Sequence, residues 1–216
     1  MYLKRHKTPK NWPVYRKGTK YVVKPRFNLE SGVPLVIAMR DLLKIATNRK
    51  EVRKAIFSKQ ILINNKFPTN EKSPILLFDT LSIIPMKKNY RLDLSDKGKF
   101  VLREISTTES DKKTTKVIDK KILKGKRIQL NFIDGRNFIS DIKCSVNDSA
   151  LINFKDKKIE KCLPFKEGSR AIIFSGKHSG KKGTIKTIDN KKKTLELESE
   201  GKEGIHALIK QTMIIE

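Results

Sequence analysis

Basic residues outnumber acidic residues by about two to one in this chain, and this excess limits how it can fold. The sequence has 49 Lys and Arg against 23 Asp and Glu, which gives a formal net charge of +26 over 216 residues. Like charges repel one another in a compact state, so a single large core gains nothing from such a surplus. With 37% hydrophobic residues, the chain is expected to fold as several small modules with basic surfaces.

The same charge indicates a polyanionic partner. Phosphate backbones are the commonest one, because Lys and Arg release condensed counterions when they bind nucleic acid. A lysine-biased proteome and a peripheral membrane protein are the two alternatives. The sequence shows no amphipathic helix with a dense basic face. Its longest apolar runs, at 35–39 and 75–78, are far shorter than the ~20 residues of a membrane span. We therefore expect no membrane partner and no secretory signal.

The two cysteines and three histidines form no metal-binding pattern. Cys144 and Cys162 lie in separate strand-like stretches without a CxxC spacing or a nearby histidine. We expect both to be reduced thiols in the core of a cytoplasmic protein. The sequence predicts no metal, no cofactor and no small-molecule substrate.

Residues 1–33 are expected to form a basic N-terminal arm. Nine basic residues precede the first acid, Glu30, and the segment has no helical apolar period. Such a segment cannot bury enough apolar surface to fold by itself. Trp12, Tyr15 and Tyr21 are interleaved with the basic residues. These aromatic side chains would either stack on bases or pack against the next module, and the sequence leaves both possibilities open.

Residues 34–87 are expected to form a compact unit of two helices followed by strands. Pro34 predicts the start of a helix that continues to about residue 46. Asn48 supplies an N-cap for a second helix at 49–57. Strands are expected at 61–63 and 81–84, with a tight turn after the first because its two asparagines tolerate positive φ.

From residue 88 onward short strands recur at regular spacing between turn signals such as Lys124-Gly125 and Asp134-Gly135. Residues 88–166 therefore predict an all-β central domain, a small barrel, in which the polar stretch 106–115 forms a mobile loop. Residues 167–216 predict a last β module with strands near 171–174, 184–188, 194–198 and 206–209.

Two segments carry recognisable RNA-binding motifs. Residues 48–56 and 61–66 resemble the S4-type RNA-binding domain, with Arg49 and Arg53 four apart on one helix face. Residues 171–185 are similar to the KOW motif, in which a glycine-rich loop with basic residues joins two strands. Its glycines let the backbone approach phosphates closely. A nucleotide-binding loop would need a helix after Gly183, where the sequence predicts a strand.

The order of these parts resembles the S4e family of small-subunit ribosomal proteins over nearly the whole chain. The resemblance implies an α+β multi-module fold, with an S4-type αα-β unit, a small all-β barrel-like middle domain and an SH3-like β-barrel KOW module. It also implies a non-catalytic, cytoplasmic protein of the ribosome that binds small-subunit ribosomal RNA and neighbouring ribosomal proteins. The candidate RNA contacts are Lys4, Arg5, Lys7, Lys10, Trp12, Arg16, Lys17, Arg40, Lys44, Arg49, Lys50, Arg53, Lys54, Asn64, Asn65, Lys66, Gly176, Lys177, His178, Gly180, Lys181 and Lys182.

Two other classes of protein share parts of this pattern. Pseudouridine synthases can carry S4-type units and have a catalytic Arg-Leu-Asp stretch, which Arg91-Leu92-Asp93 matches. The structural alternative is an exposed Asp93 carboxylate on a hairpin strand, and the rest of the chain leaves no room for a large catalytic domain. Transcription-elongation factors also carry KOW modules, but as a rule they lack an S4-type unit.

Overall fold

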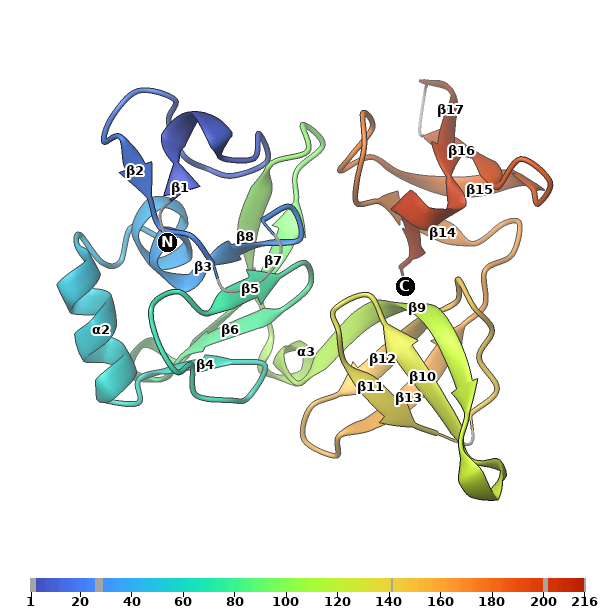
Figure 1. Ribbon diagram of the computed structural model, residues 1–216, viewed down its shortest axis with the longest axis horizontal. Helices are drawn as coiled ribbons and strands as arrows, with labels where there is room; N and C mark the ends of the chain where they lie inside the picture. Colours follow the sequence, from blue (N-terminus) through green and yellow to red (C-terminus); the bar gives the residue numbers. More distant parts are fainter. Residues whose placement is uncertain (1–2, 26–28, 141, 200–201, 216) are drawn as a thin grey trace. The chain divides into compact units, whose positions relative to one another are not determined.

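The computed structural model describes residues 3–25, 29–140, 142–199 and 202–215, and it is mostly β with few helices (Figure 1). The chain divides into two compact units. The first comprises residues 1–94 and 99–111, and the second comprises residues 95–98 and 112–216. Among the residues that the structure describes, no helix is both long and apolar enough to cross a membrane.

The first unit is built on a four-stranded antiparallel sheet of order β4-β6-β7-β8. Its strands are β4 (Ile61–Ile63), β6 (Thr80–Ile83), β7 (Lys88–Leu94) and β8 (Phe100–Ile105). Two further pairs of short strands are β1 (Leu3–Lys4) with β2 (Tyr21–Val22), and β3 (Gly32–Pro34) with β5 (Pro74–Leu76). The helices are η1 (Arg5–Lys7), α1 (Leu35–Ile37), the π-helix η2 (Ala38–Leu42), α2 (Arg49–Phe57), η3 (Ile84–Met86) and α3 (Thr107–Ser110).

The second helix formed as predicted, but the first is shorter than predicted. Asn48 caps α2, because its side-chain oxygen accepts from the N–H groups of Lys50 at 2.9 Å and Glu51 at 3.1 Å. Pro34 pairs with Pro74 in the β3–β5 ladder and is the N-cap residue of α1, so the helix begins one residue later than predicted. The helix that follows widens into a π-turn and ends before Lys44, whose φ of 55° is left-handed.

The strands at 88–94 and 100–105 belong to the first unit instead of the central β domain expected from the sequence. Thr80 pairs with Arg91 and Leu92 pairs with Leu102, so β7 and β8 extend the sheet begun by β4 and β6. Regular strand spacing does not reveal which sheet a strand joins. The stretch 106–115 was also wrongly predicted as a loop, because it contains α3 and the start of a long strand.

The N-terminal arm packs within the first unit. Leu3 and Trp12 are only 5% and 3% exposed, and Trp12 Nε1 donates to the carbonyl oxygen of Leu29 at 3.0 Å. The arm has no core of its own, but it folds because these side chains are buried against the rest of the unit. The sequence left open whether the aromatic residues stack on bases or pack against the protein. Trp12 packs against the protein, whereas Tyr15 is 88% exposed.

The second unit contains two five-stranded antiparallel sheets, of order β11-β10-β9-β12-β13 and β17-β16-β15-β14-β18. Each sheet has its own buried cluster, with Val117, Leu130 and Ile152 in the first, and Ile173, Ile185 and Leu197 in the second. The strands of the first sheet are β9 (Lys112–Ile122), β10 (Ile128–Phe132), β11 (Asn137–Ile139), β12 (Ser149–Asn153) and β13 (Lys158–Leu163). Those of the second are β14 (Arg170–Ile173), β15 (Lys182–Asp189), β16 (Thr194–Ser199), β17 (Lys202–Leu208) and β18 (Thr212–Ile214).

The two cysteines are paired, in contrast to the separate reduced thiols that the sequence predicted. Cys144 and Cys162 form a disulfide with their Cα atoms 5.9 Å apart. Cys162 lies on β13 opposite Ala150, and this antiparallel pairing brings it close to the segment that contains Cys144. A separation of 18 residues without a motif does not reveal such a neighbour.

Lys116 is a buried lysine that links the two sheets of the second unit. It lies on β9 and is only 3% exposed. Its Nζ donates to the carbonyl oxygen of Ile209 and, at 2.9 Å, to that of Thr212, the first residue of β18. Burial lowers its pKa from 10.5 to about 8.

This pKa predicts a stability that depends on pH. Between pH 8 and 10.5 the unfolded state binds the Lys116 proton more tightly than the folded state, so the contribution of Lys116 to stability rises with pH. Below pH 8 the cost of burying the ammonium is present in full. We expect the difference in unfolding free energy between wild type and Lys116→Met to shift by about 2 kcal/mol toward wild type from pH 8 to 10. Denaturant titrations at several pH values measure it, and a constant difference would contradict the assignment.

Candidate nucleic-acid interface

Two arginines on α2 are held in place by one buried carboxylate. Glu71 Oε1 accepts from Arg49 Nε at 2.9 Å and from Arg53 Nη2 at 3.1 Å, and it also contacts Arg49 Nη2. The Glu71 side chain is 5% exposed, whereas the arginine side chains are 48% and 51% exposed. The carboxylate thus orients two guanidinium groups whose outer edges face solvent.

The ionised state of Glu71 results from two opposing effects. Burial acts to raise its pKa, but the hydrogen bonds from Arg53 and Arg49 outweigh burial and lower the pKa to about 2. Glu71 is therefore charged at neutral pH, and the cluster keeps a net positive charge. Sequence reasoning missed Glu71, because it lies 18 and 22 residues from its partners. The only indication in the sequence was that Glu71 is a single acidic residue in a basic segment.

The asparagine turn after β4 formed as predicted, but its side-chain amides form hydrogen bonds within the protein. Asn64 and Asn65 have φ values of 50° and 59°. Asn64 is 4% exposed, and its side-chain oxygen accepts from the Thr80 N–H at 3.0 Å. Asn65 Nδ2 donates to Asp111 Oδ1 at 2.6 Å. Of the three turn residues predicted to contact RNA, only Lys66 is exposed.

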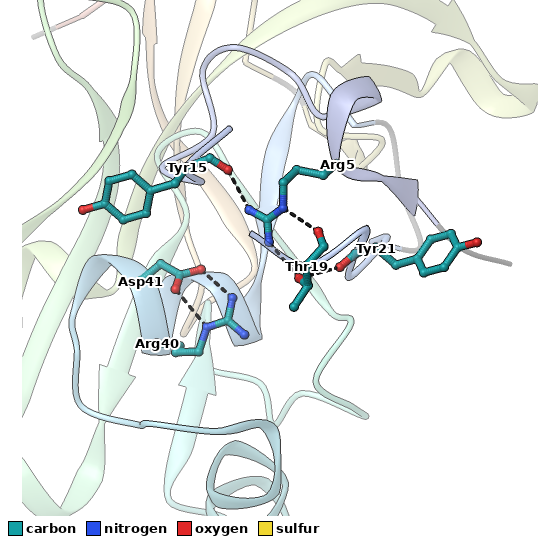
Figure 2. A network of polar contacts seen from close by, with 6 residues as sticks. All are labelled: Arg5, Tyr15, Thr19, Tyr21, Arg40 and Asp41. Atoms are coloured by element: carbon teal, nitrogen blue, oxygen red, sulfur yellow. Dashed lines mark hydrogen bonds and ion pairs between the residues drawn. The ribbon is translucent and has the colours of Figure 1, made fainter. Parts of the chain in front are cut away.

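Arg5 organises the arm. Its Nε and Nη2 donate to the Thr19 carbonyl oxygen at 2.6 Å and Thr19 Oγ1 at 2.8 Å, and its Nη1 donates to the Tyr15 carbonyl oxygen at 2.6 Å. Figure 2 shows the rings of Tyr15 and Tyr21 pointing away from this guanidinium on opposite sides. Arg5 therefore holds the loop of the arm in shape, in addition to any contact with RNA.

A hollow of about 220 Å³ lies between this loop and η2. Lys17 and Arg40 are among its lining residues. Arg40 forms two 2.8 Å hydrogen bonds with the Asp41 carboxylate (Figure 2), so part of its charge is neutralised locally. The exposed predicted cations of this region are Lys4, Lys7, Lys10, Arg16, Lys17 and Lys44, together with Lys50 and Lys54 on α2.

The glycine-rich loop joins β14 to β15 in the second unit. Gly176 and Gly180 both have φ of 92°, which favours glycine. A Cβ on Gly180 would lie 1.9 Å from the carbonyl oxygen of Ser95, and one on Gly176 would lie 2.8 Å from Gln211 Oε1. The loop therefore needs glycine at position 180 for its packing against a backbone atom, whereas at position 176 the obstacle is the end of a flexible side chain and the positive φ is what favours glycine. Lys177 is exposed, and His178, Lys181 and Lys182 are partly buried.

No metal site emerges from the part of the chain that the structure describes, and the candidate catalytic Asp93 is bound by protein groups. This part of the chain contains no group of three or more His, Cys, Asp or Glu placed to hold a metal ion. Asp93 is 1% exposed, so the prediction of an exposed carboxylate was wrong. Its Oδ2 pairs with Arg103 Nε at 3.3 Å, and its Oδ1 accepts from the Leu94 N–H at 2.9 Å. These partners give Asp93 a structural role.

The mostly β fold with clusters of exposed basic side chains is typical of nucleic-acid-binding proteins. Residues 86–159 match a family model described as "Ribosomal family S4e". The chain is 35% identical over 190 residues to small ribosomal subunit protein eS4 of Methanocella arvoryzae, covering 87% of this chain and 80% of that protein. It is 36% identical over 191 residues to the eS4 protein of Methanothermobacter thermautotrophicus, covering 87% and 79%.

A solved structure agrees with these relatives. The crystal structure of 30S ribosomal protein S4e from Thermoplasma acidophilum superposes with a TM-score of 0.73 at 28% identity, covering 86% of this chain and 95% of that one. This chain belongs to the S4e family of ribosomal proteins. Membership of this family makes the protein a structural one and not an enzyme.

Proposed function

We propose that this protein binds small-subunit ribosomal RNA and stabilises the small ribosomal subunit, where neighbouring ribosomal proteins are its other partners. The observation that carries the proposal is the pair of α2 arginines oriented by Glu71. A buried acid that fixes two half-exposed guanidinium groups preorganises them for phosphate oxygens. Preorganised groups lose less side-chain entropy on binding.

In this proposal each part of the chain makes its own contacts with RNA. The helices and turn at 34–66 act as an S4-type unit, with Arg49, Arg53 and Lys66 facing the RNA backbone. The last sheet acts as a KOW module of SH3-like type, in which Lys177, exposed in the glycine-rich loop, supplies charge. Trp12, Asn64 and Asn65 act inside the protein, because their polar or aromatic groups are buried or hydrogen-bonded there.

The salt dependence of binding tests this proposal. Each neutralised phosphate lowers log K by roughly 0.7 to 0.9 for each unit of log salt concentration. With roughly a dozen contacts spread over the arm, α2 and the loop, the slope is expected to be about −8 to −11. Filter binding of purified small-subunit rRNA between about 50 and 300 mM salt measures it. A shallow slope, or equal affinity for other acidic polymers, would contradict the proposal.

A further inference from the structure

Phe57, the last residue of α2, presents its ring to solvent. Its exposed fraction is 83%, while Val52 on the same helix is fully buried. Burying a phenylalanine ring stabilises a folded protein, and Phe57 contributes almost none of this stabilisation because its ring is exposed. Phe57 therefore adds little to the core that Val52 helps to form.

The ring lies on the basic face of the helix. Phe57 follows Arg53 by four residues and Lys54 by three, so both are its neighbours on the helix surface. Arg49, Arg53 and Phe57 form one row of i, i+4 and i+8 positions. Glu71 holds the two arginines of this row, and Lys50 and Lys54 are exposed beside it. An occupant of this face must therefore accept both dense positive charge and a flat apolar ring.

We propose that Phe57 stacks on an unpaired base of the RNA whose phosphates are bound by Arg49 and Arg53. The inference rests on the proposed function and specifies the kind of RNA that this face takes. A nucleobase combines a π-face with an adjacent phosphate, which matches an aromatic ring beside two guanidinium groups. An acidic protein surface would satisfy the charges but would offer the ring no specific stacking partner.

The chemistry of phenylalanine limits what this contact can recognise. The ring has no hydrogen-bond donor or acceptor, so it does not distinguish one base from another. In a regular duplex the bases are already stacked on each other. The α2 face is therefore selective for a helix end, bulge or junction with an unpaired nucleotide, and tolerant of its identity.

Three substitutions at position 57 separate stacking from other contributions. Phe57→Ala removes the ring, Phe57→Leu keeps apolar volume without an aromatic face, and Phe57→Trp keeps an aromatic face. The full-length variants are compared for binding to an rRNA fragment that contains an unpaired segment and to a fully paired duplex of equal length. We expect Phe57→Ala and Phe57→Leu to bind the unpaired RNA about 5- to 100-fold more weakly, and Phe57→Trp to bind like wild type.

The controls are the duplex and the folded stability. All variants should bind the duplex within about twofold of wild type, and thermal unfolding without RNA should be unchanged because the ring is exposed. Equal loss on both RNAs, wild-type affinity of Phe57→Leu, or a destabilised Phe57→Ala would each overturn the stacking assignment. Failure of the wild-type protein to bind rRNA at all would instead overturn the proposed function.

Discussion

Replacing both Arg49 and Arg53 with alanine is expected to weaken rRNA binding by about two to four orders of magnitude and to destabilise the first unit. The loss of affinity follows from two charge-assisted contacts, each worth roughly 1.5–3 kcal/mol. The loss of stability, about 1–3 kcal/mol, arises because Glu71 loses both of its half-exposed partners. Denaturant unfolding and filter binding measure the two effects.

A third substitution separates these effects. Adding Glu71→Gln to the double variant removes the unpaired charge, so stability should largely return while RNA affinity stays low. If affinity returned as well, the arginines would act only through folding and not through contact with RNA.

The acid response gives a further check on Glu71. Its folded pKa of about 2 is below the ordinary value of 4.5, so its stabilising contribution is present above pH 4.5 and is lost as the pH falls toward 2. The triple variant, with a neutral amide at position 71, should lack this part of the acid transition.

Replacing Gly180 with alanine is expected to destabilise the second unit by about 3–5 kcal/mol. The new Cβ would meet the Ser95 carbonyl oxygen, a backbone atom that cannot rotate away, and the φ of 92° is strained for alanine. Gly168 is the matched control, because it has a φ of 80° but no atom within 4 Å of an added Cβ. Gly168→Ala should therefore cost only about 1 kcal/mol, the conformational part alone.

Unfolding curves of the two glycine variants measure this difference. The sequence interpretation assigned the loop glycines to close approach of phosphates, and that role predicts reduced RNA binding with normal stability. Equal stability of both variants would favour the phosphate role over packing against Ser95.

Features that depend on neighbouring residues in the chain were predictable from sequence. The Asn48 cap, the bounds of α2 and the positive φ values of Asn64 and Asn65 all follow from local backbone chemistry. The row of arginines also follows, since helical spacing places residues four apart on one face. The overall charge indicated a nucleic-acid partner because Lys and Arg release counterions from phosphate backbones, and it disfavoured a single large core because like charges repel one another.

Features that depend on distant residues were decided by the tertiary structure. Nothing near Glu71 indicates that it lies beneath Arg49 and Arg53, and nothing in the arm indicates that Trp12 is buried while Tyr15 is exposed. The pairing of the cysteines likewise depends on strand register. Sequence alone determined which side chains carry the charge and where the helix that displays them begins and ends. Tertiary packing decided which of the charged side chains are held in place and which polar groups form hydrogen bonds inside the protein. Burial and long-range hydrogen bonds exist only once the chain has folded.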